Sequence, residues 1–151
     1  FRSQRDTEAL RQAVGEGLID LIATDHAPHH FDDKDVEYNY ASFGIVGLET
    51  AVGLVVTNLV EPGILDWAGV ARLMSLGPAR LFGLKAKGRL EAGGDADLTI
   101  IDPKAEWTVD PAGFASKGRN TPFGGMVLRG RVTATIVRGR PVVLDGKLVE
   151  Q

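Results

Sequence analysis

The sequence has 151 residues, and its content of 44% hydrophobic and 25% charged residues allows a packed core and argues against disorder. Its net charge of -3 and scattered basic residues offer no surface for nucleic acid, and no apolar run is long enough to span a membrane. The absence of Cys excludes disulfides and thiol catalysis, and it favours a reducing, cytoplasmic setting.

The first half of the chain alternates helix and strand signals. Ser3 and Asp6 form a capping-box pattern, which predicts a helix that begins there and is stopped by Gly15 and Gly17. The apolar run 18–23 is rich in branched side chains and predicts a parallel strand buried on both faces. A polar loop follows over 25–46, and loops of this length inside a compact domain are usually functional or disordered.

Helical periodicity returns after this loop. Apolar residues recur at intervals of three and four over 48–59, which predicts a well-defined helix. Asp66 is placed to cap the next helix. We expect Gly77-Pro78 to interrupt that helix, with Pro78 in the first turn of a short helix over 79–82.

The helical period disappears after residue 85, and the remaining segments predict β-strands. The segment 97–103 ends in a proline, which we expect to stop the strand. Asp145-Gly146 predicts a two-residue hairpin turn, because such turns require positive φ. The other predicted strands cover 106–109, 132–138, 142–144 and 147–149.

The polar residues that follow the predicted strand 18–23 are the candidate site. Groups at the carboxyl ends of parallel strands converge on ligand sites, and Asp25 is at such an end. A carboxylate there is able to bind a divalent metal and to exchange a proton with metal-bound water. His29, four residues after Asp25 on the same loop, has room to donate a hydrogen bond to a substrate carboxylate or carbonyl. An ordinary turn cap at Asp25 is the alternative.

The chain's three histidines, His26, His29 and His30, do not predict a zinc site of their own. Adjacent histidines rarely point at one ion, and no Cys or distant His completes a tetrahedron. We therefore expect surface or supporting roles for His26 and His30.

The long loop carries two further features. Its acidic stretch 32–37 predicts a solvated loop tip. Tyr38, Tyr40 and Phe43 indicate either a lid over a pocket or an apolar anchor for the loop, and Gly44 allows a backbone amide to approach a ligand closely.

The segment 22–29, Ile-Ala-Thr-Asp-His-Ala-Pro-His, resembles the signature of dihydroorotases, a family of cyclic amidohydrolases. The resemblance implies an α/β fold in which residues 1–84 are the C-terminal part of a (β/α)₈ amidohydrolase barrel and residues 85–151 are strands of a small β-sandwich. Further motifs similar to this family are Phe1-Arg2-Ser3 with Asp6 to Leu10, 43–50, 77–84, 94–98 and 120–125.

The resemblance also implies a reaction and site residues. The reaction is the reversible cyclisation of N-carbamoyl-L-aspartate to dihydroorotate, in pyrimidine biosynthesis, at a centre of one or two zinc ions. Asp25 matches a metal ligand that acts as general base in hydrolysis and as general acid in reverse. His29 matches a contact to the substrate carboxylate, and Phe43 and Gly44 match positions whose backbone meets the substrate ring.

The family's other metal ligands and a substrate-binding Asn lie upstream in its members and have no counterpart in this sequence. We therefore expect a piece of a longer enzyme or of a split one, with exposed barrel edges. A zinc site needs about four ligands, so the isolated chain is expected to bind zinc poorly and to be inactive.

Two other functions remain open at this stage. An allantoinase or hydantoinase shares the family chemistry, although His29 favours an acidic substrate. A non-catalytic homologue that serves as a scaffold for aspartate transcarbamoylase is the other alternative. A small-molecule substrate and a possible homo-oligomer complete the expectations, with neither nucleic acid nor membrane as a partner.

Overall fold

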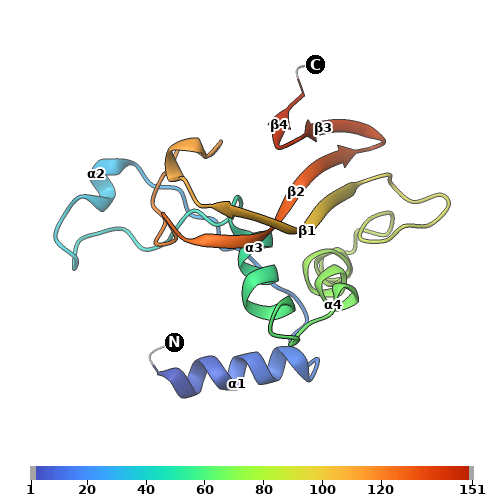
Figure 1. The fold of residues 1–151 in the computed structure, drawn as a ribbon, viewed down its shortest axis with the longest axis horizontal. Helices are drawn as coiled ribbons and strands as arrows, with labels where there is room; N and C mark the ends of the chain where they lie inside the picture. Colours follow the sequence, from blue (N-terminus) through green and yellow to red (C-terminus); the bar gives the residue numbers. More distant parts are fainter. Residues whose placement is uncertain (1–2, 150–151) are drawn as a thin grey trace.

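The computed structural model describes residues 3–149, so Phe1 and Arg2 of the first family-like motif lie outside it. Helices occupy the first part of the chain and a four-stranded antiparallel sheet occupies the second (Figure 1). The helices are α1 (Gln4–Gly15), α2 (Phe31–Lys34), α3 (Ala51–Val55), η1 (Val56–Val60), α4 (Trp67–Ala71), η2 (Arg72–Leu76), α5 (Gly77–Leu81) and η3 (Pro111–Gly113). The strands are β1 (Leu98–Thr108), β2 (Val127–Val137), β3 (Arg140–Leu144) and β4 (Lys147–Leu148).

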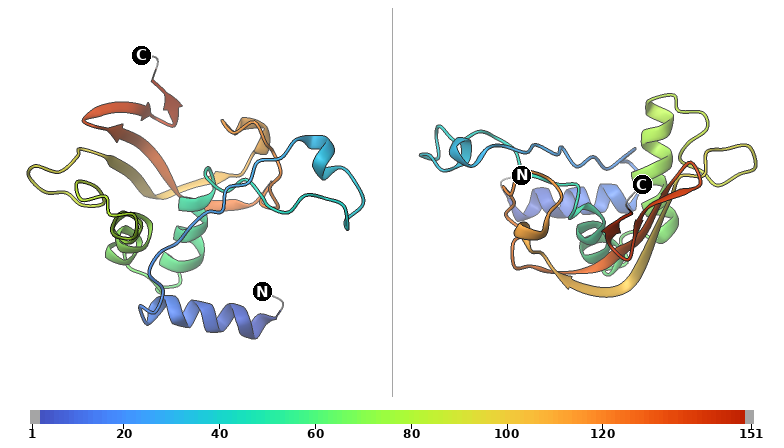
Figure 2. Two further views of the ribbon diagram at one scale, coloured as in Figure 1. Left: turned by 180° about the vertical axis from the view of Figure 1, so that it is seen from behind. Right: turned by 90° about the horizontal axis from the view of Figure 1, so that it is seen from above.

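The predicted capping box at the start of α1 is confirmed. The Ser3 hydroxyl accepts from the Asp6 amide at 3.2 Å, and the Asp6 carboxylate accepts from the Ser3 amide at 3.1 Å. The helix ends at Gly15, as predicted. In Figures 1 and 2, α3 and α4 lie between α1 and the sheet.

The strand predicted over 18–23 is wrong for the described residues. This segment is extended but has no strand pairing, and Leu18 is 69% exposed. A strand needs a neighbour that supplies backbone hydrogen bonds, and the part of the chain that the structure describes places none beside it. Ile22 instead donates its amide to the Leu73 carbonyl of η2, at 3.0 Å.

The helical region is more continuous than the sequence predicted. The Asp66 cap is confirmed, with its carboxylate accepting from the Gly69 amide at 2.7 Å. Pro78 does lie in the first turn of α5, but Gly77 does not break the helix: its amide donates to the Arg72 carbonyl five residues back. This π-type turn lets η2 continue directly into α5.

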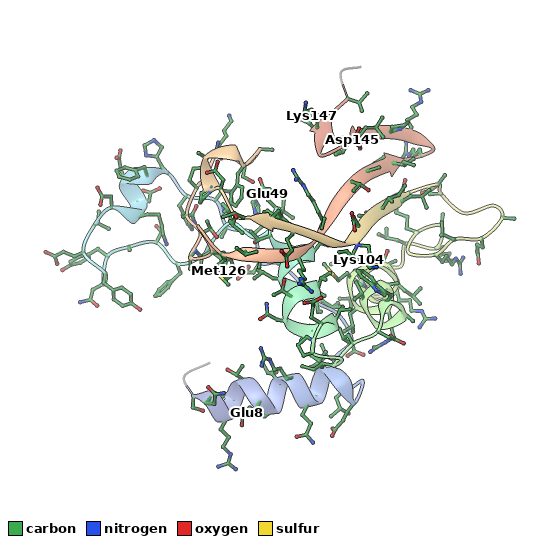
Figure 3. All side chains as sticks on the ribbon, in the orientation of Figure 1. Glu8, Glu49, Lys104, Met126, Asp145 and Lys147 are labelled. Atoms are coloured by element: carbon green, nitrogen blue, oxygen red, sulfur yellow. The ribbon has the colours of Figure 1, made fainter. Side chains whose placement is uncertain are left out.

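The sheet confirms the predicted hairpin and corrects one strand end. Asp145 and Gly146 both have positive φ, 49° and 72°, and connect β3 to β4; Asp145 is labelled in Figure 3. The expectation that Pro103 stops its strand is wrong. β1 runs through it to Thr108, because the pairing with β2 shifts register between Asp102 and Glu106, so Pro103 needs no partner for a missing N–H.

The core joins the two parts of the chain. Its buried residues come from the segment before α3, from the end of β1, from the 114 region and from β2. They are Val46, Val109, Phe114 and Leu128, with Leu54, Trp107 and Phe123 packed around them. Arg129 of β2 adds ion pairs to Glu61 and Glu106, so the helical segment is fixed to the sheet by charge as well as by packing.

Residues 3–149 form helices and one open sheet, with neither a closed barrel nor a second sheet among them. Large apolar side chains remain exposed in the helical part, including Leu81 at 68% and Phe82 at 73%. None of the helices in this described stretch combines the length and apolar character that crossing a bilayer requires.

Candidate active site

Asp25 lies where the extended segment ends, and its backbone conformation is unusual. It has φ 47°, in the left-handed region that non-glycine residues rarely adopt. Its carboxylate is exposed and makes no hydrogen bond or ion pair with residues 3–149. A strained residue with an unengaged carboxylate is typical of a functional position, where conformation serves a ligand contact.

The three predicted substrate-binding residues lie together. The imidazole Nε2 of His29 is 2.7 Å from the carbonyl oxygen of Phe43. Gly44 follows with φ 110°, and a Cβ built on it would lie 2.5 Å from the Ala27 side chain and 3.4 Å from His29 Nε2. Only glycine fits this position, because both the backbone angle and the space exclude a side chain.

His29 also borders a groove between the long loop and the segment after η3. The groove has a volume of about 770 Å³ and is lined by residues 28–31, 34, 35 and 117–120. Asp25, Phe43 and Gly44 are not among its lining residues. The groove therefore gives a ligand access to His29 from one side, whereas Asp25 is exposed and lies outside the groove's lining.

His26 makes contacts within the protein, in line with the supporting role expected for it. Its Nδ1 accepts from the amide of Gly47 at 3.1 Å and from that of Leu48 at 3.4 Å. The proton is therefore on Nε2, which lies 3.5 Å from the Ser116 hydroxyl. His26 thus joins three segments that are distant in sequence.

Glu49 completes this chain of contacts, which sequence reasoning missed. It accepts from the Ser116 amide at 2.8 Å and from the Ser116 hydroxyl at 3.2 Å. Partial burial raises the pKa of the Glu49 carboxyl, but the hydrogen bonds from Ser116 outweigh it, so the pKa is lowered from its usual value. Figure 3 labels Glu49 just before α3.

The long loop 25–46 is stabilised by hydrogen bonds between its own residues. His30 caps α2 by accepting the Asp32 amide at 3.3 Å, which confirms a structural role for it. Lys34 donates to the carbonyls of Ser42 and Gly44. Tyr38 is 93% exposed and therefore does not anchor the loop against the described residues.

The described residues contain no group of three or more His, Asp or Glu side chains that could hold a metal ion. The three histidines have separate partners, and Asp25 stands apart with free oxygens. One carboxylate does not make up a zinc site. Residues 3–149 therefore do not form a complete metal centre by themselves.

A scan against protein families matches residues 1–142 to the amidohydrolase family. The chain belongs to this family. The match covers both the helical part and most of the sheet.

The curated relatives that this chain resembles include several dihydroorotases. The chain is 58% identical over 145 residues to a dihydroorotase of Pelotomaculum thermopropionicum, covering 96% of this chain and 34% of that protein. It is 49% identical over 149 residues to a dihydroorotase of Mycobacterium tuberculosis, covering 98% of this chain and 35% of that protein. The chain thus spans about a third of the length of the curated relatives it matches.

Solved structures share the fold. An L-hydantoinase (dihydropyrimidinase) from Arthrobacter aurescens superimposes with a TM-score of 0.93 at 35% identity, covering 99% of this chain and 34% of that one. A D-hydantoinase (dihydropyrimidinase) from a Thermus species gives a TM-score of 0.91 at 32% identity. The fold of this chain therefore matches about a third of each of these hydantoinase chains.

Proposed function

We propose that this chain is the C-terminal third of a dihydroorotase, which interconverts N-carbamoyl-L-aspartate and dihydroorotate. The main support is the identity of 58% to a protein of that name across nearly the whole chain. The clustering of His29, Phe43 and Gly44 agrees with this function, because it presents a ring nitrogen beside backbone that no side chain covers at Gly44.

In the proposed reaction, Asp25 moves the proton. In hydrolysis, water attacks the ring carbonyl carbon and the ring C–N bond breaks. Asp25 takes the proton that water loses and returns it to the departing nitrogen, so no net proton is gained; cyclisation runs the same transfers in reverse. Its unpaired carboxylate and exposed position suit this role, because no protein group competes for the proton.

His29 and the 43–44 backbone orient the substrate in this proposal. The Phe43 carbonyl accepts from His29 Nε2, so contact with the substrate carboxylate falls to the second ring nitrogen, Nδ1, which donates to it when the ring carries a proton on both nitrogens. Gly44 leaves space for the substrate ring to approach the backbone.

Zinc is the proposed cofactor, as one or two ions per complete subunit, and Asp25 is the ligand that this chain would supply. When bound, zinc activates water and polarises a carbonyl. We propose that the remaining ligands lie upstream in a longer chain, since residues 3–149 contain no cluster of three or more His, Asp or Glu side chains that could hold a metal. The isolated chain is accordingly proposed to be inactive.

The fold proposal follows from the exposed apolar surface. We propose that residues 1–84 close a (β/α)₈ barrel with preceding segments and that residues 85–151 contribute strands to a β-sandwich. Leu18, Leu81 and Phe82 are large, apolar and exposed, and packing against the rest of a barrel would bury them.

The competing function is that of a hydantoinase. It is supported by the 35% identity to a solved hydantoinase, which is lower than the 58% identity to a dihydroorotase. The test is an assay of the full-length protein, loaded with zinc, against dihydroorotate, hydantoin, dihydrouracil and allantoin. Consumption of dihydroorotate alone is expected. Preference for one of the neutral rings would replace the proposal with that activity. Zinc binding without turnover of any of them would indicate a non-catalytic homologue, for which co-purification with aspartate transcarbamoylase is the next measurement.

A further inference from the structure

The two segments that carry the site residues have few direct connections. Residues 25–30 and 43–46 are irregular, and they are joined directly by one parallel bridge between His26 and Ile45 and by the contact of His29 Nε2 with the Phe43 carbonyl. The Ala27 amide donates to the Ile45 carbonyl at 2.8 Å. These direct contacts are few, and a residue from a distant segment adds three side-chain hydrogen bonds to them.

That residue is Asn120, which lies beyond η3 in the second part of the chain. Its side-chain Nδ2 donates to the Ala27 carbonyl at 3.0 Å and to the Gly44 carbonyl at 3.2 Å, while Oδ1 accepts from the His29 amide at 3.3 Å. Both amide hydrogens and the amide oxygen are used. Its backbone carbonyl also accepts from the Val46 amide at 3.0 Å.

From these contacts, and on the basis of the proposed function, we infer that Asn120 is a positioning residue for substrate binding. It sets the distance between the segment that carries His29 and the segment that carries Phe43 and Gly44. It is half-buried at the wall of the groove that His29 also borders, and it touches no reacting atom in the proposed mechanism. The β part of the chain would thereby control the geometry of a site whose ligand-binding groups lie in the helical part.

The side-chain chemistry of position 120 is specific. Two carbonyl oxygens and one amide N–H converge on it, which requires two donors and one acceptor in a single plane. Asparagine meets this requirement, whereas aspartate of the same shape presents an oxygen to both carbonyls and repels them. Asn120→Asp is therefore the sharpest variant, and Asn120→Ala removes the same contacts without adding charge.

A matched control is Asn58. Its Nδ2 donates to the Leu54 carbonyl at 2.9 Å within the α3–η1 helical segment, away from the site. Asn58→Asp makes the same chemical change and also breaks a bond to a backbone carbonyl. It reports what such a change costs when only structure is affected.

The test uses the full-length protein with three readouts: the KM and kcat for dihydroorotate, the zinc content, and amide hydrogen exchange of the segments 26–30 and 43–47. In Asn120→Asp, the KM is expected to rise about 10- to 100-fold, because misplaced binding groups weaken substrate contacts. The kcat is expected to change less than the KM, with zinc content as in the wild type. Exchange in both segments should accelerate in this variant and not in Asn58→Asp.

Unchanged KM and unchanged exchange in a folded Asn120→Asp or Asn120→Ala protein would overturn the inference. Equal changes in the Asn120 and Asn58 variants would also overturn it, since they would indicate a general structural role. Should the Asp variant fail to fold, the Ala variant is measured in its place with the same expectations. A wild-type protein that ignores dihydroorotate would reject the proposed function, while accelerated exchange confined to the two segments would still support the positioning role of Asn120.

Discussion

The ring nitrogen Nε2 of His29 lies 2.7 Å from the carbonyl oxygen of Phe43. Because a carbonyl only accepts, Nε2 carries a proton, and Nδ1 is the nitrogen left for a ligand, donating to a carboxylate when it is protonated as well. One side chain therefore serves two tasks, holding the backbone before Gly44 and offering a second nitrogen outward. The two tasks are separable by substitution.

His29→Asn and His29→Gln separate them. The Asn amide nitrogen takes roughly the place of Nδ1, whereas the Gln amide nitrogen takes that of Nε2. If Nδ1 meets the substrate carboxylate, the KM of the full-length enzyme should be lower for His29→Asn than for His29→Gln by about tenfold, the size of a hydrogen bond to a charged group. The reverse order in steady-state kinetics would assign His29 to holding Phe43 instead.

Asp25→Asn tests the proton-transfer role without changing side-chain shape. Turnover of dihydroorotate by the full-length enzyme should fall by about 10²- to 10⁴-fold, the usual contribution of a general acid–base group. Folding should change little, because Asn tolerates left-handed φ well and the carboxylate has no partner among residues 3–149. Asp25→Ala should lose the same activity and an added ~1 kcal/mol of stability through backbone strain. Near-normal activity in either variant would remove Asp25 from the mechanism.

Local signals in the sequence predicted local structure correctly. The Ser3 capping box, the Asp66 cap and the Asp145-Gly146 turn each depend on atoms a few residues apart, and each is present. The strand over 18–23 was wrong because a strand depends on neighbours that its own residues do not specify. β1 passed through Pro103 because a register shift removed the need for that amide.

The candidate site likewise contains residues that the sequence could predict and residues that it could not. Asp25, His29, Phe43 and Gly44 could be predicted as site residues because they fall in one loop with a recognisable motif, and the structure brings the last three together. The supports were missed because they are far away in sequence: Asn120 lies 91 residues from His29. A polar residue in a run such as Asn120-Thr121-Pro122 signals a turn, and nothing local says which carbonyls it will reach.

Gly44→Ala should damage the site through both strain and collision. The new Cβ would meet Ala27 Cβ at 2.5 Å, and φ 110° is unfavourable for alanine. Gly125→Ala is the control, because Gly125 also has positive φ, 79°, but nothing lies within 4 Å of its Cβ position. Thermal unfolding of both full-length variants should show the larger loss for Gly44→Ala, with a rise in KM for that variant alone. Equal losses would mean that the close contact at Gly44 relaxes freely.

The Glu49–Ser116 contact should make stability depend on pH in the acidic range. Burial raises the pKa of Glu49, but the hydrogen bonds from Ser116 lower it by more than burial raises it. The folded protein therefore holds the carboxyl proton of Glu49 less tightly than the unfolded chain does. Its stabilising effect is therefore complete above the unfolded pKa and is lost as the pH falls through the folded pKa.

Glu49→Gln tests this dependence. The variant should be less stable than the wild type at neutral pH, and the difference should shrink on acidification, as measured by denaturant unfolding at several pH values. Ser116→Ala, which removes the hydroxyl donor but keeps the amide bond at 2.8 Å, should lose part of the same effect. A stability difference that stays constant with pH would mean that the charge on Glu49 is not what Ser116 stabilises.

Thr50 offers a stabilising substitution. Its side chain is 1% exposed, and its hydroxyl has no hydrogen-bond partner within the described part of the chain. A buried hydroxyl without a partner is destabilising, and valine has the same shape without it, so Thr50→Val should raise the free energy of unfolding by about 1 kcal/mol. Thr57→Val is the matched control, because the Thr57 hydroxyl accepts from the Arg129 amide at 2.9 Å and its loss should destabilise. Melting temperatures of both full-length variants decide between these outcomes. A decrease for Thr50→Val would show that the hydroxyl finds its partner in a segment outside residues 3–149, and that segment would then pack directly against the start of α3.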